Sequence, residues 1–152
     1  MDAITLLKTD HEKVSGIFEK LEATTERAEK TREELFTQLK LELDLHAHVE
    51  EKIFYPVLKK AEETREITLE GIQEHHVVKR LLSELDAMEV GSEIWTAKLK
   101  VLKENVEHHV EEEEGEMFKG AREVLSTEQL EELGTLIEEE KRQQKPLMAS
   151  AS

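Results

Sequence analysis

The chain has 152 residues, of which 38% are charged, a formal net charge of −15 and no cysteine. This length is typical of one domain with its own core. The lack of cysteine excludes disulfides, zinc–thiolate sites and cysteine-held iron–sulfur clusters, and the negative charge argues against nucleic acid or an anionic membrane surface as a partner. The first residues lack the basic start and apolar run of a signal peptide, and no stretch has the length of a membrane span, so we expect a cytoplasmic protein.

Good helix formers dominate the composition, and amphipathic periodicity predicts an all-α protein. The predicted helices span residues 3–23, 31–63, 67–89, 92–123 and 126–144. Thr31 is expected to cap the second helix, and Pro56, which lies inside it, is expected to kink it. We expect one domain over residues 1–145 and a flexible tail over residues 146–152.

Two stretches carry the same H-x-x-x-E spacing: LHAHVEEKIFYP, with His46 and Glu50, and EHHVEEEEGEM, with His109 and Glu113. Residues four apart project side by side from an α-helix, so an imidazole and a carboxylate at this spacing can hold one metal ion. Each pair also continues the apolar stripe of its helix, which places it on the core side. We therefore expect two metal-holding pairs inside a helix bundle.

An internal repeat relates the first two helices to the third and fourth. DHEKVSGIFEKL around His11 matches EHHVVKRLLSEL around His75, 64 residues later, and an acid precedes both histidines. The two H-x-x-x-E pairs are related at an offset of 63, and an aromatic residue stands nine positions after the histidine of each. A duplicated helix pair packs most simply as an antiparallel up-down four-helix bundle, here with a short fifth helix. Lys119 stands where the first half has Pro56, so the halves are expected to differ beyond the pairs.

Six histidines and acids fall at core positions of four different helices. They are His11, His46, Glu50, His75, His109 and Glu113. A single histidine on an apolar stripe is usually a hydrogen-bonded core residue, but an unpaired buried carboxylate is strongly unfavourable. No lysine or arginine falls in the stripes at this level, so metal cations are the simplest counterions. His48, His76 and His108 lie off the stripes and are expected at the surface or behind the ligands.

The donor set indicates which metal would bind. Six nitrogen and oxygen ligands without sulfur exceed what a four-coordinate structural zinc site uses, whereas imidazole with carboxylate suits iron or manganese. Two ions bridged by the two carboxylates would use all six residues and leave positions open for a small molecule. The Glu-x-x-His motif of ferritin-like di-iron bundles is absent.

This order of residues, with a lone histidine and an H-x-x-x-E pair in each half, resembles the hemerythrin-like (HHE cation-binding) domain family over about residues 3–123. The resemblance implies a non-haem di-iron centre, oxo- or hydroxo-bridged, held by the same six residues, and reactivity toward O₂. Oxygen-carrying members have a further histidine where this chain has Lys79, and their second acid follows at a spacing of five. The sequence leaves open whether Lys79 or another residue completes the iron coordination.

We therefore expect a protein that binds O₂, NO or peroxide at a carboxylate-bridged iron pair. The alternatives are a di-iron enzyme with catalase- or peroxidase-like activity, an iron or oxygen sensor or store, and a purely structural bundle without iron. The fifth helix either covers one end of the bundle or uses its apolar face to bind a partner. The sequence does not specify an oligomeric state.

Overall fold

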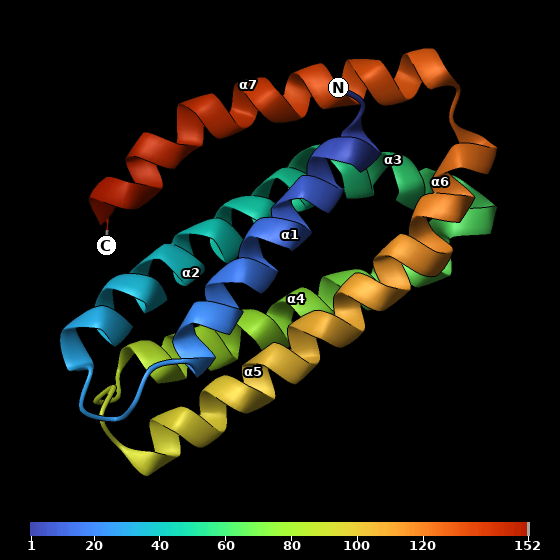
Figure 1. Cartoon of the computed structure of the whole chain (residues 1–152). Coiled ribbons are helices and arrows are strands. Elements are labelled where there is room, and N and C mark those ends of the chain that lie inside the picture. The colour runs from blue at the N-terminus through green and yellow to red at the C-terminus, as the bar shows by residue number, and fades with distance from the viewer. Residues whose placement is uncertain (152) are drawn as a thin grey trace.

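The structure is a computed structural model that describes residues 1–151. These residues are mostly helical and form no strand, which confirms the all-α prediction. The helices, with two π-helical segments labelled η, have the following bounds: α1 Ala3–Glu22, α2 Glu29–Val49, η1 Glu50–Phe54, α3 Tyr55–Lys60, α4 Glu62–Asp86, α5 Glu93–Glu112, η2 Glu113–Met117, α6 Phe118–Val124 and α7 Thr127–Ala151. In Figure 1, α1, α2, α4 and α5 form the four-helix bundle, and α7 runs along its α1–α2 side. None of the described helices is both long enough and apolar enough to cross a membrane.

The start of α2 corrects one prediction. The helix begins at Glu29 after Ala28, which provides no side-chain cap, so Thr31 lies inside the helix instead of capping it. The buried side chain of Arg32 fixes this start, because its guanidinium donates hydrogen bonds to Thr24 Oγ1 (2.9 Å) and to the carbonyl of Val90 (2.7 Å). The segment before α2 is thereby tied to the turn between α4 and α5.

The helix geometry just past each H-x-x-x-E pair corrects the prediction of a proline kink. The backbone widens there into a π-helical turn in both halves, in which the N–H of Tyr55 donates to the carbonyl of Glu50 and that of Phe118 to Glu113. Pro56 follows this turn at the start of α3. Since the second half forms the same turn with Lys119 at that position, the proline is not its cause. The two halves share this backbone turn beyond the pairs, and π-turns of this kind are frequent at functional sites.

The last helix is longer than predicted. Instead of ending near residue 144, α7 continues to Ala151 with Pro146 in its interior, so the segment expected to be a flexible tail is helical up to that residue. Ser152 lies outside the described residues. Ion pairs near the end of α7 hold it against the bundle, including Lys145 with Glu42 at 3.4 Å. Its apolar face is buried against the bundle, so α7 covers the α1–α2 side.

Two apolar clusters fill the interior, one on each side of a polar layer. One cluster joins the start of α1 with α3, α6 and α7, and the other joins the rest of α1 with α2, α4 and α5 around the fully buried Trp95. The buried acids and histidines of the two H-x-x-x-E pairs lie between them. The bundle therefore holds these acids and histidines in one layer between two regions of apolar packing.

Candidate metal centre

The structure brings all six predicted residues together in this polar layer. Their exposed fractions are at most 8%, and Glu50 and Glu113 are fully buried. Ligand atoms of Glu50, His75, His109 and Glu113 lie within 4.8 Å of one another, as do those of His11, His46 and Glu113. Glu113 thus belongs to both groups, which is the arrangement expected of a carboxylate shared by two ions.

The two glutamates connect histidines from different helices. Glu50 Oε1 lies 3.0 Å from His46 Nε2 and 3.1 Å from His75 Nε2. Glu113 Oε1 lies 2.9 Å from His11 Nε2, and its Oε2 lies 3.2 Å from His109 Nε2. Every histidine of the set therefore presents Nε2 to the centre.

The Nδ1 atom of each of these histidines faces a second carboxylate on the outer side. The four contacts are His11 with Glu114 (2.6 Å), His46 with Asp10 (2.8 Å), His75 with Glu51 (2.9 Å) and His109 with Glu74 (2.6 Å). These acids follow the repeat, because each histidine of one half and its acid have counterparts in the other half. A carboxylate that accepts the Nδ1 proton fixes the ring and leaves Nε2 free to bind a metal.

Tyr55 is a site residue that sequence reasoning missed, as it missed the outer carboxylates. Its buried hydroxyl donates to Glu113 Oε2 at 2.6 Å, lies 3.2 Å from Glu50 Oε1, and lies 3.3 Å from Nε2 of both His75 and His109. The π-helical turn η1 ends at Phe54, directly before Tyr55. The signal in the sequence was the aromatic residue nine positions after each histidine, since only the first half has a hydroxyl there.

The surroundings of this tyrosine differ between the halves. The ring of Tyr55 stacks on His75 with centroids 5.2 Å apart, whereas its counterpart Phe118 stacks on His11 at 6.1 Å. Gly71 of α4 leaves room for the hydroxyl, because a Cβ at this glycine would lie 3.2 Å from Tyr55 Oη. The group of His75 and His109 therefore has an extra oxygen donor that the group of His11 lacks.

Lys79 does not reach the centre. Its side chain is about half exposed, and its ammonium lies 3.1 Å from Oε2 of Glu51, the acid that accepts from His75 Nδ1. The pKa of Glu51 is lowered to about 2, chiefly by the hydrogen bond from His75 and further by the one from Lys79. Lys79 thus acts on the outer carboxylate and provides no ligand.

Charges within the layer compensate one another through protonated histidines. Burial lowers the pKa of His109, but hydrogen bonds to Glu113 and Glu74 outweigh it and raise the pKa to about 10. The pKa of His46 is likewise raised well above its usual value, against the effect of burial. Burial raises the pKa of Glu113, and its contacts with three histidines lower it far more. Metal binding would have to displace these protons from Nε2.

The donor atoms fit metal ions better than they fit one another. His46 Nε2 and Glu50 Oε2 are fully buried and have no hydrogen-bond partner. The 3.0 Å contact of His46 with Glu50 Oε1 is close enough for an ion pair but is not directed as a hydrogen bond. Buried polar atoms without partners are rare and call for an explanation. Imidazole nitrogens, carboxylates and a phenol, without thiolate, are the ligands that iron and manganese accept.

The three histidines that were not predicted to be ligands lie at the surface or behind the site, as expected. His48 contacts Glu140 at 2.6 Å, His76 is exposed, and His108 is 64% exposed at its side chain.

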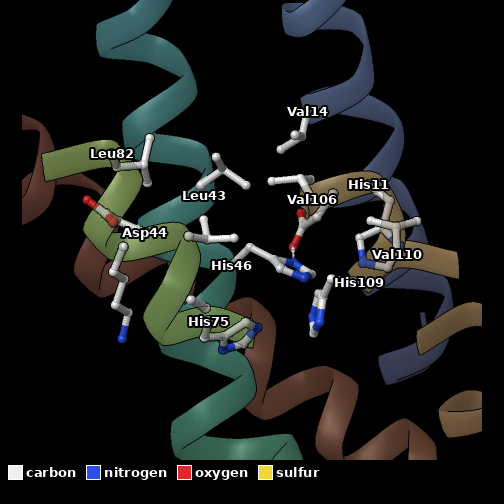
Figure 2. A pocket seen from close by; sticks show the side chains of 14 residues that line it. His11, Val14, Leu43, Asp44, His46, His75, Leu82, Val106, His109 and Val110 are labelled. Atoms are coloured by element: carbon white, nitrogen blue, oxygen red, sulfur yellow. Dashed lines mark hydrogen bonds and ion pairs between the residues drawn. The ribbon is translucent and has the colours of Figure 1, made fainter. Parts of the chain in front are cut away.

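A cavity of about 30 Å³ opens beside the centre. Figure 2 shows imidazole rings from four helices converging there beside an apolar wall that includes Val14, Leu43, Leu82 and Val106. A water molecule needs roughly 10–15 Å³ of such space, so the cavity holds about two water-sized centres. A molecule of two heavy atoms fits this space.

Comparison with known proteins supports the same interpretation. A sequence profile described as "Hemerythrin HHE cation binding domain" matches residues 2–121. A crystal structure of a hemerythrin HHE cation-binding domain-containing protein from Mycobacterium kansasii is similar, with a TM-score of 0.85 and 28% identity, covering 96% of this chain and 88% of the other. A protein of a Nostoc species named as a DNA nickase is 29% identical over 135 residues, which are 89% of this chain and 38% of that protein. This chain thus spans less than two fifths of the length of that relative.

The family profile extends over most of the chain, and the fold and the buried histidine–glutamate layer agree with it. The chain therefore belongs to the hemerythrin HHE cation-binding domain family.

Proposed function

We propose that the protein holds two iron ions, oxo- or hydroxo-bridged, in the polar layer and binds O₂, NO or peroxide there. The observation that carries this proposal is that Glu113 belongs to both groups of ligand atoms. His11 and His46 would hold one ion and His75 and His109 the other, with Glu50 and Glu113 between them. Two ferrous ions held by these residues would be able to supply one electron each to the same small molecule.

The chain's own residues account for how such a molecule is selected. The apolar walls of the cavity, which include Val14, Val78 and Val106, offer no hydrogen bonds to water and favour a small, weakly hydrated molecule. The cavity volume is consistent with a ligand of about the size of O₂, NO or peroxide. The four outer carboxylates keep the imidazole rings fixed while a ligand enters and leaves.

Turnover of peroxide, as in a catalase or peroxidase, is the second candidate, and Tyr55 favours it. Its hydroxyl lies within hydrogen-bond reach of both glutamates and two histidines. Burial and the charges of Glu113 and Glu50 raise its pKa well above the usual value, so the group keeps its proton. Reactions of peroxide need protons at the oxygen atoms, and this phenol is placed to hold or donate one.

Two further candidate activities are that of an iron sensor or store and the nicking of DNA. An iron sensor or store predicts that the stability of the bundle depends on iron, whereas the histidines and glutamates of the metal-free layer already pair with one another. Nicking of DNA is named for a relative of which this chain spans only part, and a net charge of −15 disfavours binding to a phosphate backbone. We therefore propose neither nucleic acid nor a membrane as a partner.

The test is metal content and the absorption spectrum after anaerobic loading with ferrous iron, followed by exposure to air. We expect about two iron ions per chain and near-ultraviolet oxo-bridged bands, with azide, NO or peroxide changing the spectrum. Glu50→Gln combined with Glu113→Gln keeps the volume and removes the shared charges, and should lose most of the iron. The matched control is Glu140→Gln, at another acid of low exposure that contacts His48 outside the centre. Folded wild-type protein without bound iron would overturn the proposal, and sustained O₂ release from peroxide would favour the enzyme.

A further inference from the structure

A second H-x-x-x-E pair lies on α5, one residue before the buried one. His108 Nε2 is 3.0 Å from Glu112 Oε1 on the outer side of the helix, and 3.6 Å from Oε2 of Glu74 on α4. Ligand atoms of these three residues lie within 4.8 Å of one another. Because the group is partly exposed, a cation could reach it directly from solvent.

Glu74 connects this surface group to the buried layer. Its Oε1 accepts the Nδ1 proton of His109 at 2.6 Å, while its Oε2 faces His108. No lysine or arginine of the described chain pairs with Glu74 or Glu112. Apart from His109, which Glu74 holds, the cationic partner of these two acids is the exposed His108, which is charged only when protonated.

The internal repeat shows what a carboxylate at this position binds when a cation is available. Asp10 is the counterpart of Glu74, and one of its oxygens likewise accepts from a ligand histidine, His46. Its other oxygen contacts the ammonium of Lys141, which α7 brings to that side. In the first half, a lysine thus contacts the second oxygen of the outer acid. In the second half, the corresponding oxygen of Glu74 faces His108 instead.

The residues at the remaining positions of the group also differ between the halves. Leu45 and Val49 are the counterparts of His108 and Glu112, and both are buried, with exposed fractions of 2% and 0%. This is the side of the bundle that α7 covers. The corresponding side of α5 carries an imidazole and a carboxylate at metal-binding spacing instead of an apolar face.

We propose that Glu74, His108 and Glu112 form a separate surface site for one divalent cation, which takes at Glu74 the place that the Lys141 ammonium takes at Asp10. One imidazole and two carboxylates, completed by water, suit Mn²⁺, Fe²⁺ or Zn²⁺. The site does not require the buried centre to hold iron. It would add a third metal ion and help to hold the carboxylate that fixes His109.

The test counts Mn²⁺ ions by the loss of the free-ion electron paramagnetic resonance signal, with iron-loaded and metal-free protein in parallel. We expect His108→Ala and Glu112→Gln to bind one Mn²⁺ fewer than the wild type in both series, with unchanged iron content. His76→Ala is the matched control. Like His108, His76 is exposed and directly adjoins a buried histidine, but it belongs to none of the three groups of possible metal ligands. It should bind as the wild type does.

A second variant separates a lost cation site from a misfolded surface. His108→Lys places an ammonium near Glu74, as Lys141 is placed at Asp10, so it should also lose one Mn²⁺ while its metal-free melting temperature exceeds that of His108→Ala. Equal Mn²⁺ counts in the wild type and His108→Ala would overturn the proposal. A fall in iron content that accompanies the loss of Mn²⁺ would also overturn it, since the site would then not be separate. Failure of the iron proposal would not affect the metal-free series.

Discussion

Replacing Tyr55 by phenylalanine tests whether the phenol belongs to the centre. The substitution removes one oxygen atom and leaves the ring, its packing on His75 and the helix backbone in place. In the metal-free protein, Glu113 Oε2 then loses its 2.6 Å hydrogen bond. Because Glu113 is fully buried, water cannot replace the lost donor without rearrangement of the layer.

The expected size follows from the type of bond that is lost. A hydrogen bond to a charged acceptor contributes about 1.5–3 kcal/mol, against about 1 kcal/mol for a neutral pair. For a chain of this length each kcal/mol shifts the melting temperature by roughly 2–4 °C, so Tyr55→Phe should lower it by roughly 3–12 °C. In iron-loaded protein, ions that bind Glu113 replace the lost donor, so the loss of stability should be smaller than in metal-free protein.

The assay is thermal unfolding followed by circular dichroism, with and without iron. Thr64→Val is the matched control, because Thr64 is also fully buried and donates a 2.6 Å hydrogen bond, but to the neutral carbonyl of Leu58. We expect the control to lose less stability, and by the same amount with and without iron. A Tyr55→Phe effect no larger than that of Thr64→Val in metal-free protein would refute the assignment of a charged acceptor to the tyrosine. A larger effect in the iron-loaded protein would identify the phenol oxygen as a metal ligand.

Three further predictions concern charge and packing. Hydrogen bonds to two carboxylates raise the pKa of His109 to about 10, above its unfolded value of about 6.5. The stability that charged His109 contributes is therefore fully present below pH 6.5 and is lost as the pH rises through 10. Melting temperatures of chelator-treated protein should fall across that window, and a flat profile would contradict the ion pairing. Gly16→Ala should raise the free energy of unfolding by up to about 1 kcal/mol, because nothing lies within 4 Å of the new methyl group. Gly134→Ala should lower the free energy of unfolding, because its Cβ would lie within 3 Å of the N-terminal backbone. Urea titrations of both variants distinguish close packing from helix propensity. Lys141→Met leaves the buried Asp10 without its ammonium partner and should destabilise the protein by about 1–3 kcal/mol. Lys98→Met, which removes a surface ion pair, should change stability by less than about 1 kcal/mol. Equal effects of the two variants in urea unfolding would show that the buried pair adds no stability.

The helical stripes and the repeat were enough to predict the bundle and the six residues that meet in its centre. Both signals depend on positions three, four or about 64 residues apart, which sequence periodicity reveals directly. The H-x-x-x-E spacing of His109 and Glu113 puts both side chains on one face whatever the rest of the fold does. Whether these residues bind metal stays a prediction, since proximity alone does not establish occupancy.

The features that were missed depend on contacts between helices or on backbone geometry without a composition signal. A π-turn needs no particular residue, so Pro56 was a reasonable but wrong cause for the change in helix path. The length of α7 depends on ion pairs with α1 and α2, such as that of Lys141 with Asp10, which no local pattern contains. The outer carboxylates Glu51 and Glu114 directly follow the predicted ligands Glu50 and Glu113, and only their contacts with His75 and His11 on other helices reveal them.

Comparison of the two halves indicates which residue makes the two metal positions unequal. Lysines pair with the outer acids of His46 and of His75, through Lys141 and Lys79, and within residues 1–151 no lysine pairs with the outer acids of His11 or His109. Each proposed ion would therefore have one histidine whose outer acid pairs with a lysine and one whose outer acid does not, so these charges balance between the two positions. The hydroxyl of Tyr55 has no such counterbalance, because its repeat partner is phenylalanine. If the two iron ions differ in ligation or in reactivity, we expect the difference to arise from Tyr55 and from Glu50, whose ligand atoms group with those of His75 and His109.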